Sequence, residues 1–464
     1  MTDKQNNFTQ TASTEDIVNL STFTSVENYD ILVLGGGPAG LAAAVSAHEN
    51  GASVLLIERE RRLGGILKQC VHDGFGLLRY KERLTGPEYA QREIDCFLAA
   101  EIPYVLESFV VDVRKEGSGY VVCAQSAAGM KAYSCKAIIL ACGCRERTSR
   151  QVFIHGQRSA GIFSAGTAQY FVNIQGKMPT KRCVILGSGD IGLIMARRLT
   201  LEGASVVGVY EIKNAPAGLS RNISQCLDDF GIPLHLSTTV TEVLGTQRVE
   251  AVAIEKVDTN MNPIPGTREI IECDALILSV GLLPEIELAN ALDIPIDPAT
   301  KGPFVDQSLM TQAAGVFACG NVLHVNDLAD WVSWSGEIAG ENAAKYCRNP
   351  RGFFTNKDGC VGGEPVLLQY SKADFLYVVP QYVSSHGPFP LTLFFRSRED
   401  VKDKTITLAS GGVTLPSEEA LQDGKGGGYI SKKYRRIIPS EMEALKVKSL
   451  GRLGDAVEFR LKME

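Results

Sequence analysis

The chain has 464 residues, of which 45% are hydrophobic and 22% charged, proportions ordinary for a globular protein and unlike those of a disordered chain. At about 150 residues per domain, this length predicts roughly three domains. Acidic residues (53) outnumber basic ones (47), and the net charge of −6 disfavours a nucleic-acid binder or a membrane-surface binder. No apolar stretch reaches the length of a membrane span, and no secretory signal is visible.

The cysteines form no recognisable motif, but they indicate the redox state of the compartment. There are 12 of them, and no two are spaced C-x-x-C, so neither a metal site nor a dithiol redox motif is predicted. Cys142 and Cys144 are spaced C-x-C, which disfavours a stable bridge between them. Others, such as Cys183 and Cys319, lie in apolar runs and are expected to be buried thiols. We therefore expect a reducing compartment, the cytoplasm.

The first ordered unit follows a polar stretch, residues 1–28, that we expect to be a flexible tail. An apolar run at 29–34, a glycine cluster, an alanine-rich helix at 41–49 and a strand at 53–57 predict a β-α-β unit. The glycines Gly35, Gly37 and Gly40 form the pattern G-x-G-x-x-G, which lets backbone approach a pyrophosphate at a helix N-terminus. Glu58, which ends the second strand, is placed to accept hydrogen bonds from ribose hydroxyls.

The same pattern recurs later in the chain. A strand at 182–186, the glycines Gly187, Gly189 and Gly192, a helix at 191–201 and a strand at 205–210 form the second unit, which ends at Glu211. An acid at this position favours NAD(H) over NADP(H), because a 2′-phosphate would meet a carboxylate. Lys213 lies two residues further on and would soften that preference. The chain therefore contains two related dinucleotide folds.

The last part of the chain has a different pattern. Short strand-like runs separated by Pro and Gly predict a small all-β domain, a sandwich, with strands at 375–383, 391–396, 405–408, 445–448 and 457–462. A glycine-rich loop lies at 424–428. The basic cluster at 432–436 is interpreted as solubilising charge at a sheet edge, and the alternative is a docking patch for an acidic partner.

A late segment, Gly315 to Asn321, precedes a predicted helix at 328–346 and completes a recognisable order of motifs. This order resembles the two-dinucleotide-binding-domain flavoproteins of the thioredoxin-reductase-like class. The resemblance implies an α/β fold with two Rossmann-like domains, for FAD and for NAD(P)H, and the strand pattern adds the small C-terminal all-β domain. In that class an Asp contacts the ribityl chain of FAD; Asn321 stands in its place here and can still hydrogen-bond a hydroxyl.

The resemblance, together with the two motifs, assigns cofactor residues and domains. The predicted FAD residues are Gly35, Gly37, Pro38, Ala39, Gly40, Glu58, Arg59, Gly64, Gly65, Gly143, Gly320 and Asn321. The predicted NAD residues are Gly187, Gly189, Asp190, Ile191, Gly192, Glu211 and Gly281. The predicted domains are a split FAD-binding domain (29–153 and 284–346), an NAD-binding domain (154–283), a linker (347–364) and the C-terminal β domain (365–464).

Three segments carry a closer resemblance: 143–148, 160–169 and 187–200. They are similar to the flavoprotein subunits of hydrogen cyanide synthase, opine oxidase and hydroxyproline or sarcosine dehydrogenases, and to bacterial subunits found beside a glycerol-3-phosphate dehydrogenase-like protein. Residues 317–325 look most like the last group. The resemblance implies an FAD-dependent, NAD-linked subunit whose partner flavoprotein oxidises glycerol 3-phosphate or an amine or imino acid. The alternatives are a self-contained NADH oxidase or small-acceptor reductase, and a non-catalytic nucleotide-binding assembly subunit.

The dithiols of related reductases are missing. Residues 64–72 contain a single cysteine, Cys70, with His72 at the second cysteine position, and residues 164–169 contain none. No catalytic residue is therefore assigned; Cys70, His72 and His324 are weak candidates, since packing explains a lone thiol or imidazole more often than catalysis does. Arg145 and Arg147 are candidates for binding a phosphate or carboxylate, and a surface turn explains them equally well.

Overall fold

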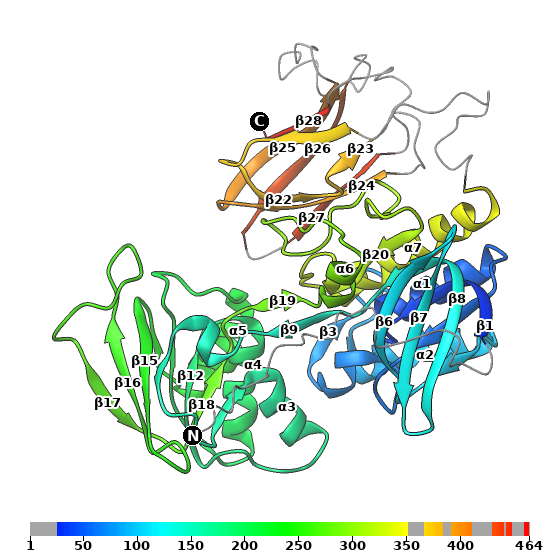
Figure 1. Cartoon of the computed structure of the whole chain (residues 1–464). Helices are drawn as coiled ribbons and strands as arrows, with labels where there is room; N and C mark the ends of the chain where they lie inside the picture. Colours follow the sequence, from blue (N-terminus) through cyan, green and yellow to red (C-terminus); the bar gives the residue numbers. More distant parts are fainter. Residues whose placement is uncertain are drawn as a thin grey trace, which may run out of the picture.

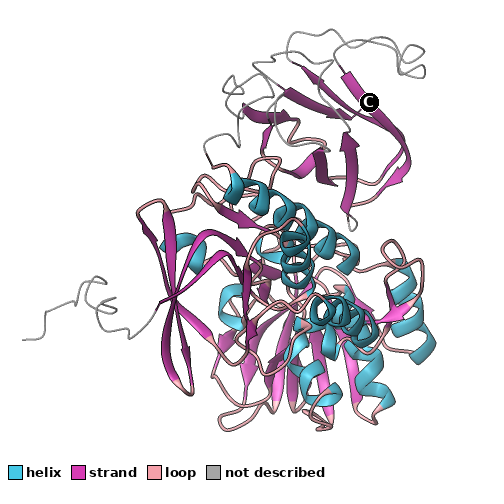
Figure 2. Cartoon of the chain, turned by 90° about the vertical axis from the view of Figure 1, so that its right-hand side faces the viewer, coloured by secondary structure: helices cyan, strands magenta, loops and turns pink. Residues whose placement is uncertain are grey.

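The computed structural model describes residues 26–350, 366–383, 391–410, 429–439, 442–447 and 459–463. It contains two bodies built from helices and strands, and a third built from strands (Figure 1). Figure 2 shows that the helices lie in the first two bodies, whereas the described C-terminal part consists of strands and loops. No helix of the described residues is both long and apolar enough to cross a membrane.

The first body is formed around a parallel sheet extended by an antiparallel hairpin. The strand order is β5-β2-β1-β8-β7-β6, and β20 pairs with β8. Its elements up to the first crossing are β1 (Val26–Leu34), α1 (Pro38–Glu49), β2 (Val54–Ile57), η3 (Gly65–Gln69), β3 (Asp73–Phe75), β4 (Leu84–Thr85), α2 (Gly86–Ala99), β5 (Tyr104–Val105), β6 (Phe109–Glu116), β7 (Gly119–Ser126), β8 (Gly129–Leu140) and β9 (Cys144–Glu146). The pairing of β20 with β8 shows that the chain returns to this sheet after leaving it.

The start of β1 corrects the predicted extent of the tail. The sequence pattern places residues 26–28 in the tail, but β1 begins at Val26, because Val26 to Tyr29 pair with Ala132 to Cys135 of β8. This long partner strand extends the ladder beyond the apolar run that signals the strand in the sequence. The tail up to residue 25 lies outside the described residues.

The second body contains the second β-α-β unit. Its parallel sheet has the order β11-β18-β12-β13-β14, and a second sheet has the order β10-β15-β16-β17. The elements are η4 (Ser149–Val152), β10 (His155–Gly156), β11 (Ile162–Ser164), α3 (Ala165–Asn173), β12 (Arg182–Leu186), α4 (Asp190–Leu201), β13 (Ser205–Tyr210), α5 (Ser220–Cys226), η5 (Asp228–Phe230), β14 (Leu234–His235), β15 (Thr238–Leu244), β16 (Ala251–Lys256), β17 (Glu269–Glu272) and β18 (Ala275–Leu278).

The two bodies are joined by a pair of crossing strands. The chain leaves the first body through β9 and returns through β19 (Leu282–Pro284), and these strands pair antiparallel. The returning part contains α6 (Glu287–Ala291), β20 (Val316–Ala318), η6 (Gly320–Val322) and α7 (Ala329–Arg348). Helix α7 continues past residue 346 to Arg348, so the first two residues of the expected linker are helical, and residues 351–365 lie outside the described part.

The C-terminal part consists of two packed sheets. One has the order β23-β21-β28-β25-β26 and the other β22-β24-β27, and apolar side chains from both form one core. The strands are β21 (Val366–Tyr370), β22 (Phe375–Val379), β23 (Tyr382–Val383), β24 (Leu391–Ser397), β25 (Val401–Ser410), β26 (Tyr429–Ile437), β27 (Met442–Val447) and β28 (Phe459–Met463). The single strand expected at 375–383 is divided at Pro380, which has no N–H to donate.

The basic cluster at 432–436 lies on β26, the edge strand of the larger sheet. Arg436 pairs with Asp400, and the Lys432 ammonium lies 4.3 Å from the ring centroid of Tyr434. This placement agrees with solubilising charge at a sheet edge. The glycine-rich loop at 424–428 lies outside the described residues.

Candidate functional site

The first glycine turn joins β1 to α1 and leaves little room for side chains. Gly35 has a φ of +115°, and a Cβ added there would lie 2.4 Å from the carbonyl oxygen of Ala141. A Cβ on Gly40 would lie 1.8 Å from the carbonyl oxygen of Gly35. At Gly37 the nearest such atom is Gly65 Cα at 3.9 Å, so the protein itself does not require glycine there. The space beside Gly37 is therefore open, which suits the close approach of a ligand to the backbone.

The N-terminus of α1 suits an anion. Gly37 is its N-cap residue, Pro38 occupies the first turn, no side chain caps the helix and the first turn has no acidic residue. The amides of this turn therefore lack a side-chain acceptor, and the helix dipole favours negative charge beside them. A pyrophosphate fits both properties, so these residues fit the FAD assigned from the sequence.

Glu58 is a buried acid, only 7% exposed, at the end of β2. Its Oε2 accepts a hydrogen bond from the Gly36 amide at 2.6 Å, and its Oε1 accepts one from the Glu60 amide at 2.7 Å. A carboxylate oxygen accepts more than one hydrogen bond, so the group keeps capacity for ribose hydroxyls. The backbone thus fixes the carboxylate beside the glycine turn.

Other predicted FAD residues lie around the same turn. The Gly64 amide donates to the Gly36 carbonyl at 2.8 Å, and a Cβ on Gly65 would lie 3.0 Å from Gly37 Cα. A Cβ on Gly320 would lie 2.7 Å from the Cβ of Ala39, which places the late segment at the start of α1. Two predicted residues are less tightly held: Gly143 has a φ of +75° with open space at its Cβ position, and Arg59 is exposed.

Asn321 is joined to two neighbouring segments. Its Nδ2 donates to Cys144 Sγ at 3.5 Å, next to Gly143, and its Oδ1 accepts from the backbone and side-chain amides of Asn326 at 3.0 and 3.1 Å. The structure thus brings Asn321, Gly143 and the start of α1 together, as the FAD assignment requires.

The second glycine turn joins β12 to α4 and packs against Ser279, which sequence reasoning did not single out. A Cβ on Gly187, where φ is +95°, would lie 2.1 Å from the Ser279 carbonyl oxygen. A Cβ on Gly192 would lie 2.7 Å from Ser279 Cβ, and the Gly192 amide donates to Ser279 Oγ at 3.1 Å. Gly281 follows with a φ of +101°. The strand containing residues 275–278 therefore supports the turn at its carboxyl end.

Glu211 is held in the same way as Glu58. It is 5% exposed; its Oε2 accepts from the Ser188 amide at 2.9 Å, and its Oε1 accepts from the Lys213 amide at 3.1 Å. In both units the acid thus contacts the amide of the middle residue of G-x-G and the amide two residues after itself. In the second unit the Ser188 hydroxyl adds a donor at 2.6 Å.

A loop crosses over the second turn, a feature that no sequence motif signalled. The amides of Ala217 and Gly218 donate to the side-chain and backbone oxygens of Ser188, each at 2.9 Å. Asp190 Oδ1 accepts from the Leu219 amide at 2.9 Å and from Asn222 Nδ2 at 2.7 Å. Asp190, predicted to contact NAD, therefore orients this loop, while Ile191 packs against the core of the second body.

A cleft of about 290 Å³ lies between the two bodies. Helices α3, α4 and α5 line one side, and residues 71–75 and 327–329 line the other. His72 lies in its wall, and burial lowers the pKa of this imidazole, which favours the neutral form. Of the three candidates Cys70, His72 and His324, His72 is the one that lines this cavity, which is large enough for a small ligand.

Cys70 and His324 are poor catalysts in these surroundings. Burial raises the pKa of the Cys70 thiol to about 12, which opposes formation of the nucleophilic thiolate. His324 is 1% exposed, and burial together with Arg396 lowers its pKa to about 3. Its ring contacts Tyr377 and Phe394 of the β domain at centroid distances of 5.6 Å. Arg145, a candidate for binding an anion, forms ion pairs with Glu285 and Glu287 instead.

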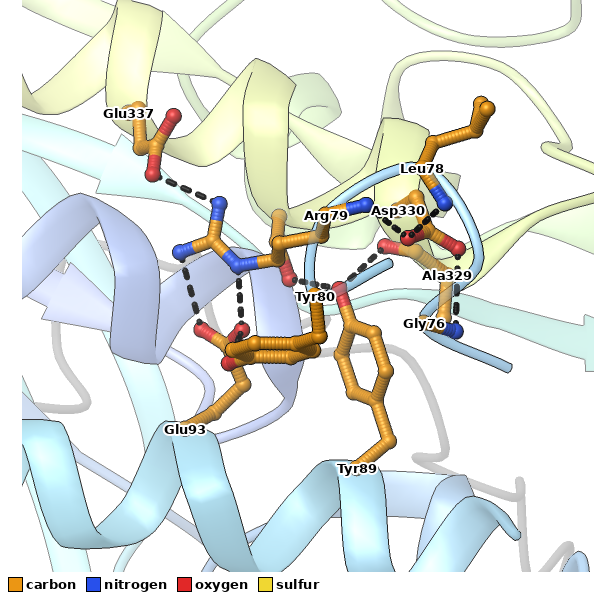
Figure 3. Close-up of polar contacts among 10 residues, drawn as sticks. Gly76, Leu78, Arg79, Tyr80, Tyr89, Glu93, Ala329, Asp330 and Glu337 are labelled. Carbon is orange, nitrogen blue, oxygen red and sulfur yellow. Dashed lines mark hydrogen bonds and ion pairs between the residues drawn. The ribbon is translucent and has the colours of Figure 1, made fainter. Parts of the chain in front are cut away.

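Figure 3 shows how the loop that follows residues 71–75 is fixed to α7. The buried Asp330 carboxylate accepts hydrogen bonds from the amides of Gly76, Leu78 and Arg79 at 2.7–3.3 Å. Arg79 pairs with the buried Glu93 and with Glu337, each at 2.6 Å. Asp330 is in the first turn of α7, so this cluster holds one wall of the cleft against the helix that follows Asn321.

No group of three or more His, Cys, Asp or Glu side chains in the described part of the chain is placed to hold a metal ion. The C-x-C cysteines are free, and burial raises the pKa values of Cys142 and Cys144 to about 12 and about 11. Cys144 contacts Asn321, and the Cys142 thiol instead contacts the carbonyl oxygen of Leu34 at 3.5 Å.

Proteins of known name have similar sequences. The chain is 24% identical over 313 residues to a subunit of opine oxidase from Agrobacterium tumefaciens, covering 63% of this chain and 61% of that protein. It is 25% identical over 338 residues to the hydrogen cyanide synthase subunit HcnB of Pseudomonas protegens, covering 68% and 67%. The chain thus spans about three fifths to two thirds of the length of these relatives.

The fold has a counterpart among solved structures. Thioredoxin reductase of Lactococcus lactis, in its FR conformation, matches with a TM-score of 0.59 at 20% identity, over 69% of this chain and 99% of that one. The model of the pyridine nucleotide-disulphide oxidoreductase family matches residues 29–339. Because that match runs across both glycine turns and both anchored acids, the chain belongs to the pyridine nucleotide-disulphide oxidoreductase family and is an FAD-dependent, NAD(P)-linked oxidoreductase.

Proposed function

We propose that this chain transfers hydride between NAD(H) and bound FAD as one subunit of a dehydrogenase complex. A partner flavoprotein would oxidise glycerol 3-phosphate or an amine or imino acid. The observation that carries the proposal is the lack of a dithiol: residues 64–72 contain only Cys70, a protonated thiol, and residues 164–169 contain no cysteine. A flavin without a dithiol beside it must exchange electrons with its second partner directly or through another cofactor.

The chain's own residues would bind and orient the two nucleotides. The first turn and Glu58 hold one, and the second turn and Glu211 hold the other, with the Glu211 carboxylate disfavouring a 2′-phosphate. FAD, when bound, supplies the two-electron chemistry. The Gln69 side-chain amide donates to the Gly166 carbonyl at 2.8 Å, and the Asn173 side-chain amide donates to the Gln69 carbonyl at 2.8 Å. These contacts hold the two bodies together beside the cleft.

Two relatives support the proposed role through their names, since the matched opine oxidase and hydrogen cyanide synthase proteins are each named as one subunit of an enzyme. The free thiols of the described residues suit a cytoplasmic location, which is part of the proposal.

The test is anaerobic mixing of the purified protein with NADH. The yellow flavin colour should bleach, and artificial dyes should be reduced, while glycerol 3-phosphate and amines should remain unoxidised until partner subunits are added. The variant Gly37→Val is the control, because its side chain would occupy the space kept for the pyrophosphate. Oxidation of a physiological alcohol or amine by the chain alone, at an ordinary turnover of about 1–10³ per second, would contradict the subunit role.

The same experiment separates the two alternatives. Rapid oxygen consumption by the isolated chain would favour a self-contained NADH oxidase. A yellow protein that NADH fails to bleach would favour an assembly subunit that binds nucleotides without turning them over.

A further inference from the structure

The C-terminal β domain shares an apolar core with the first body. On β22, β24 and β27, side chains facing one way fill the domain's own core, including Phe375, Leu393, Phe395 and Leu445. Side chains facing the other way belong to the core of the first body, including Tyr377, Val379, Phe394, Met442 and Ala444. The smaller sheet is thus buried on both faces, so the β domain packs directly against the first body.

The polar contacts at this junction converge on Asp327. Arg396 of β24 donates two hydrogen bonds to its carboxylate, both at 2.7 Å, and the Met442 amide donates a third at 2.8 Å. Arg396 also donates to Tyr377 Oη at 3.2 Å and to the Pro439 carbonyl at 2.9 Å. Both bonds to Asp327 come from one nitrogen, Arg396 Nη2, which contacts the two carboxylate oxygens, while Nε and Nη1 serve Tyr377 and Pro439. The side chains of Arg396 and Asp327 are only 15% and 29% exposed, so water screens this ion pair weakly.

Asp327 is the end of a short segment that begins at Asn321. Asn326, the neighbour of Asp327, donates two hydrogen bonds to Asn321 Oδ1, and its side chain also donates to the His324 carbonyl at 2.8 Å. The His324 ring is enclosed by Tyr377 and Phe394 of the β domain. The β domain therefore contacts both ends of the segment 324–327, at His324 and at Asp327. Asn326, within this segment, donates to the side-chain oxygen of Asn321 and so fixes that side chain.

We infer that the C-terminal β domain completes the FAD site, with Arg396 as a positioning residue that orients Asn321 through Asp327 and Asn326. The inference rests on the proposed function and on the role predicted for Asn321, which is to contact the ribityl chain of FAD. Asn321 adjoins Gly320, whose Cα approaches Ala39 at the start of α1, and Asn321 itself contacts Cys144 beside Gly143. Loosening segment 324–327 should therefore release a hydrogen-bonding side chain at the point where three predicted FAD segments meet.

The experiment compares FAD binding by full-length variants. Arg396→Ala should raise the Kd for FAD by about two- to tenfold, the fold-change of one lost hydrogen bond between neutral groups, and should speed the release of fluorescent flavin. Arg396→Lys keeps the charge but not the three nitrogens that reach Tyr377, Pro439 and Asp327, so its Kd should fall between that variant and the parent. The Kd for NADH should not change, because Glu211 and the second turn lie in the other body.

The matched control is Arg436→Ala. Arg436 also forms a two-bond pair with an aspartate, Asp400, but on the edge strand β26 of the other sheet. It should bind FAD like the parent. If Arg396→Ala fails to fold, Asp327→Asn provides the second test, since it keeps an acceptor for the Met442 amide while weakening the ion pair.

The outcomes are distinguishable. A parent protein that binds no FAD would overturn the proposed function. A parent that binds FAD, together with folded Arg396→Ala and Asp327→Asn variants of unchanged Kd and release rate, would overturn only the inference. An equal loss in Arg436→Ala would also overturn it, because the effect would then report general destabilisation of the domain.

Discussion

At the scale of single residues, Glu58 and Glu211 are held by the same pattern of hydrogen bonds in the two β-α-β units. Glu58 and Glu211 are both buried, and each is fixed by two backbone amides rather than by a cation. Hydrogen bonds from amides stabilise a carboxylate without neutralising it. Each carboxylate is therefore held in place beside a glycine turn, where we predict that it accepts hydrogen bonds from ribose hydroxyls.

Glu211→Ala should weaken the use of NADH, because one charged acceptor is lost. We expect a loss of about 1.5–3 kcal/mol, or roughly ten- to hundredfold in kcat/KM for NADH. NADPH should suffer less or improve. Ser188→Ala is the control: it removes the hydroxyl that contacts Glu211 but leaves the carboxylate. An unchanged NADH/NADPH ratio in Glu211→Ala would show that another residue selects the nucleotide.

His324 gives the protein an acid-sensitive site. Its folded pKa of about 3 lies below the unfolded value of about 6.5, so the unfolded state binds more protons in between. The contribution of His324 to stability is therefore present above pH 6.5 and is lost as the pH falls toward 3. At pH 5 the cost is about 2 kcal/mol.

His324→Phe should remove that cost while keeping an aromatic ring against Tyr377 and Phe394. Denaturant unfolding at pH 7 and pH 5 measures the difference: the parent should lose about 2 kcal/mol more than the variant between the two values. Equal losses would mean that His324 does not remain neutral in the folded protein. His155→Phe, at an exposed position, is a suitable control.

At the scale of elements, the packing of α7 on α1 positions the first glycine turn, which is predicted to bind the pyrophosphate of FAD. A Cβ on Gly336 would lie 2.2 Å from the carbonyl oxygen of Ala39, and one on Gly340 would lie 2.2 Å from that of Ala43. These two glycines let α7 approach the backbone of α1 closely. Ala39 lies in the first turn of α1, so the contact sets the position of the amides that are predicted to face FAD.

Gly336→Ala should force the two helices apart. Overpacking of this kind costs about 1–3 kcal/mol, and we expect weaker FAD binding together with a lower Tm. Glu341→Ala, on the exposed face of α7, should change neither by more than a few tenths of a kcal/mol, because its pair with Lys345 is on the surface. A Gly336→Ala protein with parental FAD affinity would show that the helix contact does not position the turn.

The sequence predicted those elements whose pattern is local. Glycine spacing and strand-end acids located both β-α-β units, because each feature is needed within a few residues of the others. Contacts made between distant segments were not predictable: Ser279 under the second turn, residues 217–219 over it, and Asp330 beneath residues 76–79. The run Leu391 to Phe395 did carry a signal, since five residues without charge suit a strand covered on both faces, but the run does not say what covers it.

At the scale of the whole molecule, the chain does not divide into independent parts. The β domain and the first body share one apolar core, and the Gln381 side chain adds a second polar contact by donating to Asp297 Oδ2 at 2.8 Å and accepting from the Val305 amide at 3.0 Å. Stabilisation of one body by a ligand should therefore reach the other.

Bound FAD should slow hydrogen exchange in β24, although β24 contains no predicted FAD residue. Mass spectrometry of the protein with and without FAD should show faster exchange in residues 391–397 when FAD is removed, while β16 in the second body should change little. Unchanged exchange in β24 would mean that the β domain and the first body open independently of each other.

The aromatic side chains at this junction have an optical consequence. The chain contains two tryptophans, and both, Trp331 and Trp334, lie on α7 beneath the β domain. Their rings stack at 5.1 Å, each lies 6.0 Å edge-on from Phe394, and the Lys446 ammonium is 3.4 Å from the Trp334 ring centroid. Since the chain has no tryptophan elsewhere, its tryptophan emission reports on this one interface. A shift to longer wavelength would register separation of the β domain without any attached dye.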